Sequence, residues 1–174
     1  PLRAEAGRAI EQLRALGVSR CVMLTGDSRR TAAAIAAQVG VDDFRAEVLP
    51  EDKAAYVQEL RGQGHTVIMV GDGINDSPAL SAANAGVAIS SGAAIAREIA
   101  DITVSEGDLE ELVILRRAAM GLMARIRSNY RFVIGFNGGL IALGLLGVLT
   151  PAAGATAHNL STLGVSLHSM TRLL

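Results

Sequence analysis

The chain has 174 residues with a formal net charge of −1, and half of its residues are hydrophobic. Charged residues make up 19% and aromatic residues 3%, which is a low charge content for an ordinary soluble domain. A near-neutral chain gives no indication of a nucleic-acid partner, and a single cysteine, Cys21, excludes a disulfide framework. The length allows one domain and an appendage.

The first 104 residues alternate expected helices with short apolar strands. Strands are expected at residues 18–24, 45–48, 66–70, 86–89 and 101–104. Helices are expected at residues 4–16, 28–36 and 92–100 and from Pro50 onward. This alternation predicts an α/β fold with a parallel sheet and helices on both faces. Functional groups in such sheets lie at the carboxyl ends of the strands.

The segment at residues 71–80 directly follows one of these strands and carries the strongest site pattern. Its candidate residues are two carboxylates, an amide and two glycines, namely Asp72, Asp76, Asn75, Gly71 and Gly73. Glycines let the backbone turn sharply at a strand end, and carboxylates are the hard oxygen ligands that Mg²⁺ prefers. The alternative is an acidic turn that caps a helix beginning at Ser77 and Pro78. The preceding strand and the four-residue spacing of the aspartates favour a metal and phosphate site.

Two upstream segments fit the same site. Thr25, Gly26 and Asp27 follow the first strand and precede an alanine-rich helix, where a hydroxyl and backbone N–H groups suit a phosphoryl oxygen. An ordinary helix N-cap is the alternative. Lys53 follows the helix start at Pro50 and could place an ammonium against a phosphate, although a single lysine is usually a surface residue. A hydroxyl, a lysine and paired aspartates at successive loops are the parts that hold a phosphoryl group and Mg²⁺.

Three segments together resemble one known family. Residues 23–27 match its T-G-D loop, residues 50–53 its P-x-x-K loop and residues 70–80 its V-G-D-G-x-N-D-x-P-A-L loop. On these motifs the chain is identified as a member of the heavy-metal-transporting P-type ATPases, whose phosphorylation domain has a Rossmann-like, haloacid dehalogenase-type parallel sheet. The resemblance implies that ATP is the substrate and that Asp72 and Asp76 hold Mg²⁺. It implies catalytic roles for the residues Thr25, Gly26, Asp27, Lys53, Asp72, Asn75 and Asp76, with Gly71 and Gly73 shaping the cofactor site.

The family's phosphorylated aspartate is missing from this sequence. That aspartate lies in a D-K-T-G-T motif, which none of the 174 residues form. The chain also begins at Pro1 without an initiator methionine or a signal segment. It is therefore expected to be the C-terminal part of a transporter, holding only part of the phosphorylation domain and inactive by itself.

The sequence changes in character after Asp108. Residues 109–128 are expected to form an amphipathic helix, and residues 132–149 form an apolar run of about the length that spans a bilayer core. Arginines precede this run, which places that end in the cytoplasm. A break at 150–154 and a more polar second span at 155–174 complete a transmembrane hairpin. The expected domains are residues 1–108, a stalk helix at 109–131 and two spans at 132–174.

A soluble helical hairpin is the alternative for these runs. Glycines within the first span would weaken a soluble helix but let membrane helices approach closely. They stand at positions 135, 138, 139, 144 and 147.

The second span contains polar groups that are costly in lipid unless they face other helices or a transport pathway. His158 and Thr162 lie one helical turn apart, and with Asn137 of the first span they form a candidate site for the transported ion. Histidine suits Zn²⁺, Co²⁺, Ni²⁺ or Fe²⁺, and Met170 could suit Cu⁺. A hydrogen bond between helices is the alternative role for His158. Residues 158–162 are similar to the H-E-G-x-T signature of the cobalt and zinc subgroup but carry Asn159 where a glutamate is expected, so the metal stays open.

The sequence therefore predicts part of an ATP-driven heavy-metal exporter that couples aspartyl phosphorylation to transport. It is expected to be a multi-pass protein of a bacterial plasma membrane, with a cytoplasmic phosphorylation domain. Its expected partners are ATP, Mg²⁺, a transition-metal cation, the lipid bilayer and the missing N-terminal part of the transporter. Two alternatives stay open, namely a membrane-anchored or soluble phosphatase of the dehalogenase-like superfamily and a non-catalytic regulatory fragment.

Overall fold

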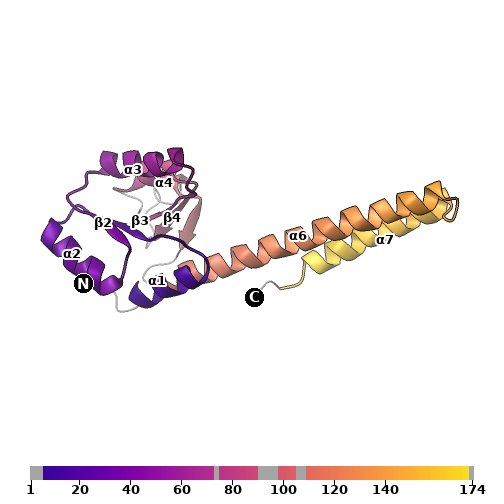
Figure 1. The fold of residues 1–174 in the computed structure, drawn as a ribbon, viewed down its shortest axis with the longest axis horizontal. Coiled ribbons are helices and arrows are strands. Elements are labelled where there is room, and N and C mark those ends of the chain that lie inside the picture. The colour runs from indigo at the N-terminus through magenta and orange to yellow at the C-terminus, as the bar shows by residue number, and fades with distance from the viewer. Residues whose placement is uncertain (1–5, 73–74, 90–97, 105–108, 173–174) are drawn as a thin grey trace. The chain divides into compact units, whose positions relative to one another are not determined.

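The structure is a computed structural model that describes residues 6–72, 75–89, 98–104 and 109–172. It divides into two compact units, Pro1–Ile114 and Leu115–Leu174. The first unit combines strands and helices, whereas the second consists of two antiparallel helices (Figure 1). Gly73 and most of the helix expected at 92–100 lie outside the described residues.

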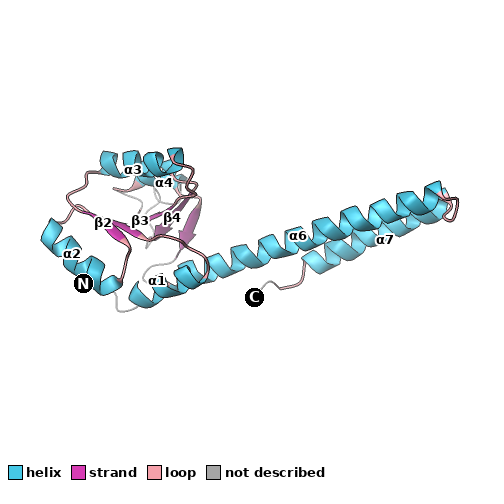
Figure 2. Ribbon diagram, in the orientation of Figure 1, coloured by secondary structure: helices cyan, strands magenta, loops and turns pink. Residues whose placement is uncertain are grey.

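The described strands of the first unit form two parallel sheets. They are β1 (Val22–Leu24), β2 (Asp43–Arg45), β3 (Ile68–Gly71), β4 (Ala85–Ile89) and β5 (Ile102–Val104). One sheet pairs β1 with β2, and the other has the order β3-β4-β5, with Val70 opposite Val87. The predicted alternation and parallel pairing are confirmed, because helices separate most of the successive strands and lie on both sides of them (Figure 2).

The helices of the first unit begin and end at residues that the sequence marks for this purpose. They are α1 (Ala6–Ala15), α2 (Arg29–Val39), α3 (Pro50–Gly62) and α4 (Ser77–Ala82). At the start of α2 the Ser28 hydroxyl accepts a hydrogen bond from the Thr31 amide, and at its end Gly40 adopts a left-handed φ of 77°. A side-chain cap and a left-handed glycine satisfy helix ends that otherwise leave backbone groups unpaired.

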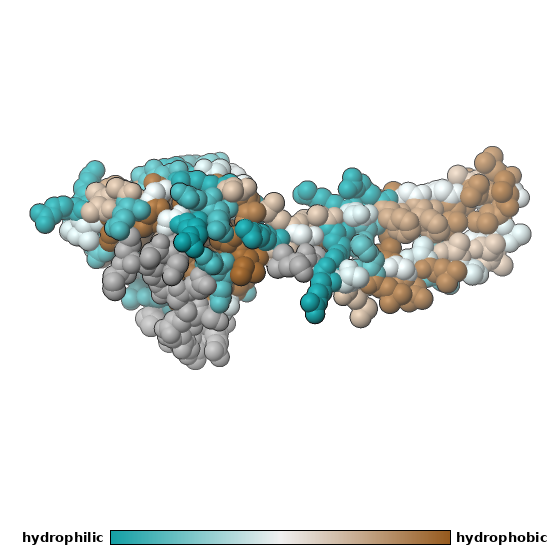
Figure 3. All heavy atoms as spheres, turned by 90° about the horizontal axis from the view of Figure 1, so that it is seen from below, coloured by the Kyte–Doolittle hydropathy of each residue, from teal (hydrophilic) through white to brown (hydrophobic). Residues whose placement is uncertain are grey.

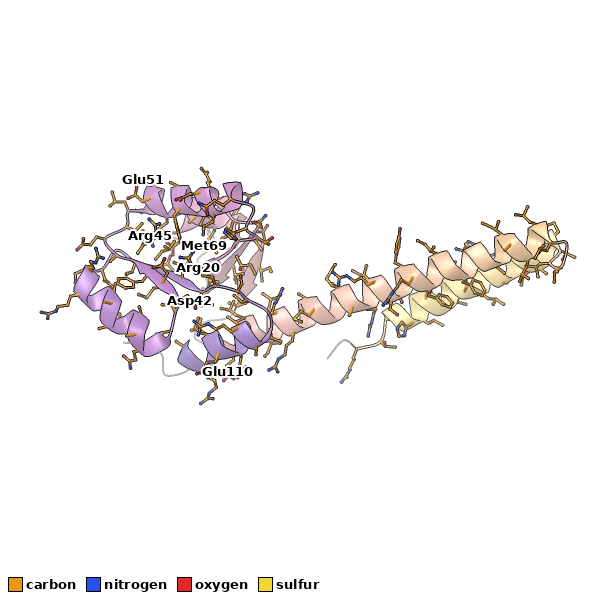
Figure 4. The ribbon with its side chains drawn as sticks, in the orientation of Figure 1. Arg20, Asp42, Arg45, Glu51, Met69 and Glu110 are labelled. Atoms are coloured by element: carbon orange, nitrogen blue, oxygen red, sulfur yellow. The ribbon has the colours of Figure 1, made fainter. Side chains whose placement is uncertain are left out.

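The core of the first unit lies between α3, α4 and β3. Val57, Met69, Ala79 and Leu80 are buried together, and Leu24 of β1 packs against this cluster. Figure 4 shows Met69 inside the unit, beneath α3. A Cβ atom at Gly86 would lie 2.8 Å from the Leu80 carbonyl oxygen. Glycine at this position therefore lets β4 lie directly against the end of α4.

The expected strand at 45–48 is the clearest error of position. The observed β2 is Asp43–Arg45, and the chain turns immediately after it. The Glu47 amide donates to the Asp27 carbonyl and the Val48 amide to the Thr25 carbonyl. Glu47 itself has a left-handed φ of 59°, which a strand does not accept. Residues 46–48 thus bind the loop after β1 instead of extending the sheet.

The second unit is a helical hairpin. Its helices are α6 (Glu110–Leu145), which starts in the first unit, and α7 (Pro151–Ser169). The amphipathic helix expected at 109–128 and the apolar run after it are thus one continuous helix. No helix in the described part of the chain combines the length and the apolar character that crossing a membrane requires, and the two predicted spans are not confirmed.

The end of α6 explains part of this difference. The helix stops at Leu145, because Gly147 takes a left-handed φ of 71° and its amide donates to the Gly144 carbonyl. Residues 146–149, which the sequence analysis assigned to the first span, form the turn. The helical residues 132–145 extend about 21 Å at 1.5 Å per residue, less than the hydrocarbon core of about 30 Å.

Candidate functional site

Lys53 and Asp76 form the central contact of the candidate site. Lys53 lies in the first turn of α3, and Asp76 is the N-cap residue of α4. The Lys53 Nζ atom lies 2.6 Å from Asp76 Oδ1, and the two side chains are only 13% and 14% exposed. A charge-assisted hydrogen bond of this kind is short and strong. Because α3 and α4 pack on the same core, their N-terminal ends hold the Lys53 ammonium and the Asp76 carboxylate close together.

Gly71, the last residue of β3, provides the space that Asp76 occupies. A Cβ atom at Gly71 would lie 2.5 Å from Asp76 Oδ2 and 2.7 Å from Asp76 Cβ. The strand end and the start of α4 thus approach too closely for any side chain. The sequence analysis explained Gly71 by a turn, but in the structure glycine is needed there because a side chain would collide with Asp76.

Asp72 and Asn75 are both exposed at this end of β3. An exposed carboxylate and an amide that follow a strand end are suitable donors for Mg²⁺, which commonly uses one or two carboxylates and keeps several waters. In the described part of the chain no group of three or more histidine, cysteine or acidic side chains could hold a metal ion. Of the two predicted magnesium ligands, Asp72 is an exposed carboxylate at the strand end, and Asp76 forms a hydrogen bond with Lys53.

The loop after β1 is held by its own hydrogen bonds. The Thr25 hydroxyl donates to Asp27 Oδ2 at 3.0 Å and accepts from the Asp27 amide at 3.1 Å. The Thr25 amide donates to the Arg45 carbonyl. Gly26 is exposed, and a Cβ atom there would make only an ordinary contact of 3.8 Å with the Val48 carbonyl. The hydroxyl proton of Thr25 thus has an internal acceptor.

The structure brings the predicted residues into two groups on one core. Asp76 bonds to Lys53 and lies against Gly71, and Thr25 contacts Asp27. Leu24, which precedes Thr25, packs against the cluster that contains Met69 of β3. The strands that carry the two groups therefore share a core.

Sequence reasoning missed an ion-pair network at the start of the β1-β2 sheet. Asp42 accepts hydrogen bonds from the Cys21 amide at 2.7 Å and from Arg14 at 2.8 Å. These contacts lower the pKa of Asp42, the Cys21 amide contributing most. Burial, and next the charge of Asp42, raise the pKa of the Cys21 thiol. Figure 4 labels Asp42 and Arg20 in this region. Cys21 is half-buried just before β1.

In the second unit the structure brings two of the three predicted ion ligands together. His158 Nδ1 lies 2.9 Å from Asn137 Oδ1. A hydrogen on Nδ1 that is donated to this amide oxygen would leave Nε2 with its lone pair. The Thr162 hydroxyl donates to the His158 carbonyl at 3.1 Å and thus bonds to its own helix. A shallow hollow of about 430 Å³ adjoins the pair, lined by Asn137, Leu140, Ile141, Pro151, Gly154, Ala155 and His158.

Comparisons with known proteins agree with both units. A haloacid dehalogenase-like hydrolase model matches residues 1–84. The chain is 42% identical over 169 residues to a manganese-exporting P-type ATPase of Mycobacterium leprae, covering 97% of this chain and 23% of that protein. It is 43% identical over 164 residues to a copper-exporting P-type ATPase of Staphylococcus haemolyticus, covering 94% of this chain and 20% of that protein. The homologues of this chain are metal-exporting P-type ATPases.

A solved P-type ATPase extends the likeness to the structure. The crystal structure of a zinc-transporting PIB-type ATPase matches with a TM-score of 0.86 and 41% identity, covering 99% of this chain and 28% of that one. The chain spans about a quarter of the length of the P-type ATPases that it matches. The similarity includes the helical hairpin as well as the α/β unit.

Proposed function

We propose that this chain forms part of a metal-exporting P-type ATPase, in which its first unit holds a phosphoryl group and Mg²⁺ while its second unit lies in the membrane. The observation that carries this proposal is the pair of Lys53 and Asp76 beside Gly71 and Asp72 at the end of β3. Such a site does little covalent chemistry itself and works by positioning and by charge compensation.

Each residue of the first unit has a defined part in this account. Asp76 holds the Lys53 ammonium in place, and Lys53 compensates the negative charge of the phosphoryl oxygens. Asp72 supplies the carboxylate for Mg²⁺, with Asn75 next to it. When bound, Mg²⁺ neutralises phosphoryl charge. Thr25 donates its hydroxyl hydrogen to a phosphoryl oxygen by turning it away from Asp27.

The phosphorylated aspartate is expected on a strand from another part of the transporter. Among the described strands, β1 pairs only with β2, and β3 pairs only with β4, so each has an unpaired edge. Leu24 shows that β1 lies against the core of β3. A strand inserted between them would join the two sheets and end between Thr25 and Asp72. The backbone amides at the unpaired edges of β1 and β3 should therefore exchange hydrogen rapidly in the 174-residue chain and slowly in the intact protein. Equal exchange rates in both would contradict the insertion.

Phosphorylation tests the proposed function directly. The 174-residue chain should form no phosphoenzyme with ATP, because it lacks the D-K-T-G-T motif. The intact protein should form one, and Asp72→Ala should abolish it because the phosphoryl charge is left uncompensated. A phosphoenzyme from the chain alone, or near-normal turnover of the variant, would overturn this assignment.

The second unit is proposed to carry part of the path of the transported ion. His158 Nε2 is the proposed ligand atom for the ion, and the hydrogen bond between Nδ1 and Asn137 fixes the orientation of the ring. The metal names of the relatives support a transition-metal cation such as Mn²⁺, Zn²⁺ or copper. His158→Ala in the intact protein should lower metal-stimulated ATPase activity, whereas the matched control His168→Ala at the exposed end of α7 should not. Unchanged metal dependence with reduced thermal stability would make His158 a structural contact only.

A membrane position for the hairpin is supported by its exposed surface and by its satisfied polar groups. Apolar side chains are largely exposed along both helices, including Ile134, Ile141, Leu160 and Leu167, and Figure 3 shows hydrophobic surface over much of the hairpin. The hydroxyls of α7 donate to carbonyls of their own helix, as Thr156 does to Ala152, and this lowers their cost in lipid.

Cysteine labelling tests the topology. A cysteine placed at Ala153, in the first turn of α7, should react only from the side opposite the arginines of α6. Labelling of this position from the cytoplasmic side would contradict the hairpin.

A further inference from the structure

The second unit carries an unbalanced positive charge. Residues 115–174 contain six arginines and no aspartate or glutamate. Five of these arginines lie on α6 between Leu115 and Arg131, and three of the five lie within seven residues of the apolar residues that begin at Phe132. No acidic side chain within the unit is therefore available to neutralise them.

The three arginines nearest the apolar residues, Arg125, Arg127 and Arg131, have different surroundings. Arg125 contacts the end of α7, donating to the Ser169 and Arg172 carbonyls, and Asn129 donates to the Ser169 hydroxyl. In contrast, Arg127 and Arg131 are exposed. Arg131 Nε donates a hydrogen bond to the Arg127 carbonyl. This bond leaves the terminal nitrogens of Arg131 available.

Helix geometry places the exposed pair on the side of α6 that faces away from α7. At about 100° per residue, Arg127 lies about 160° and Arg131 about 120° around the helix from Arg125. The two arginines are separated by one turn, or about 6 Å along the axis. Tyr130, which is 66% exposed, lies between them in sequence. Exposed apolar residues follow the two arginines and the tyrosine, as is usual at a membrane surface.

We propose that Arg127 and Arg131, together with Tyr130, bind the headgroups of anionic phospholipids at the cytoplasmic surface of the membrane. The inference rests on the proposed membrane position of the hairpin. A guanidinium matches a phosphate with two parallel hydrogen bonds, and the negative leaflet surface attracts basic residues that lie within a Debye length of it. Arg131 borders the apolar run, and Arg127 lies within about 8 Å of its start along the axis, a depth that falls within the headgroup layer.

Arg117 provides a matched control. It is exposed and also lies on α6, but its position is about 22 Å from Phe132 along the helix axis. This distance exceeds both the headgroup layer and the Debye length at physiological salt. Replacement of Arg117 by glutamine removes the same charge from the same helix without removing a headgroup contact.

The test measures the partition of the 174-residue chain onto vesicles of phosphatidylcholine, with and without phosphatidylglycerol, at physiological ionic strength. Wild-type chain should bind both and should prefer the anionic vesicles. Arg127→Gln and Arg131→Gln should each reduce this preference about fivefold, while Arg117→Gln should leave it unchanged. Equal loss in all three variants would indicate general charge attraction and overturn the site, as would an unchanged preference in Arg127→Gln and Arg131→Gln.

The same experiment separates this inference from the proposed function. If the chain binds neither kind of vesicle, the membrane position of the hairpin fails and the lipid site fails with it. If the chain binds both kinds equally, the membrane position holds and only the lipid site is overturned.

Discussion

Replacement of Gly71 by alanine tests the geometry of the phosphate site. The new Cβ would lie 2.5 Å from Asp76 Oδ2 and 2.7 Å from Asp76 Cβ. Because Asp76 Cβ is fixed to the backbone, a change of side-chain rotamer cannot relieve the conflict. Overpacking costs about 1–3 kcal/mol, and disruption of the charged hydrogen bond to Lys53 costs about 1.5–3 kcal/mol. Together these costs lead us to expect that Gly71→Ala lowers the free energy of unfolding by about 2.5–6 kcal/mol.

Urea unfolding of single and double variants isolates the cause. In an Asp76→Gly background the contacting Cβ and carboxylate are gone, so adding Gly71→Ala should cost less than about 1 kcal/mol. Gly62→Ala is the matched control, because a Cβ atom there meets nothing within 4 Å; it should be neutral or stabilising, since alanine favours helix. The reasoning is refuted if Gly71→Ala costs the same with and without Asp76.

Three further predictions concern other parts of the first unit. The raised pKa of Cys21 should slow its alkylation by iodoacetamide at pH 8, so the rate should increase on unfolding in urea, and equal rates would contradict the shift. The lowered pKa of Asp42 means that its contribution to stability is present above the unfolded pKa of about 3.9 and is lost as the pH falls through the folded pKa. The stability gap between wild type and Asp42→Asn should therefore narrow in urea titrations below pH 4, and a constant gap would refute this. Glu47→Gly should be neutral or stabilise the protein by up to about 1 kcal/mol, because glycine adopts the left-handed backbone conformation of this position without strain. Glu47→Val should destabilise the protein by more than about 1 kcal/mol. A valine variant as stable as wild type would contradict the presence of backbone strain at Glu47.

The sequence pattern was sufficient for the α/β unit because its signals are local. Short apolar runs, the serine cap of α2 and the proline at the start of α3 each specify an element from a few neighbouring residues. The displaced β2 shows the limit of such signals. Residues 45–48 have strand-like composition, but hydrogen bonds from Glu47 and Val48 to a loop about 20 residues earlier decide their conformation.

The partners of the candidate site residues could not be predicted from the sequence. The motif suggested Asp76 as a magnesium ligand, yet the structure places it against Lys53, 23 residues away. The pairing depends on how α3 and α4 pack, which no local pattern encodes. In the second unit the structure brings His158 within 2.9 Å of Asn137, and their role as ion ligands stays a prediction. The Thr162 hydroxyl instead bonds to the His158 carbonyl, an option open to any helical threonine.

The central claim is that this chain supplies the magnesium and phosphate groups for an aspartate located elsewhere in the transporter. The most direct test is the Mg²⁺ dependence of phosphoenzyme formation by the intact protein, compared among wild type, Asp72→Asn and the exposed control Glu51→Gln on α3 (labelled in Figure 4). The account predicts that Asp72→Asn gives no phosphoenzyme or requires at least about tenfold more Mg²⁺, equivalent to about 1.4 kcal/mol, while Glu51→Gln follows the wild-type curve. An unchanged Mg²⁺ curve for Asp72→Asn would contradict the account.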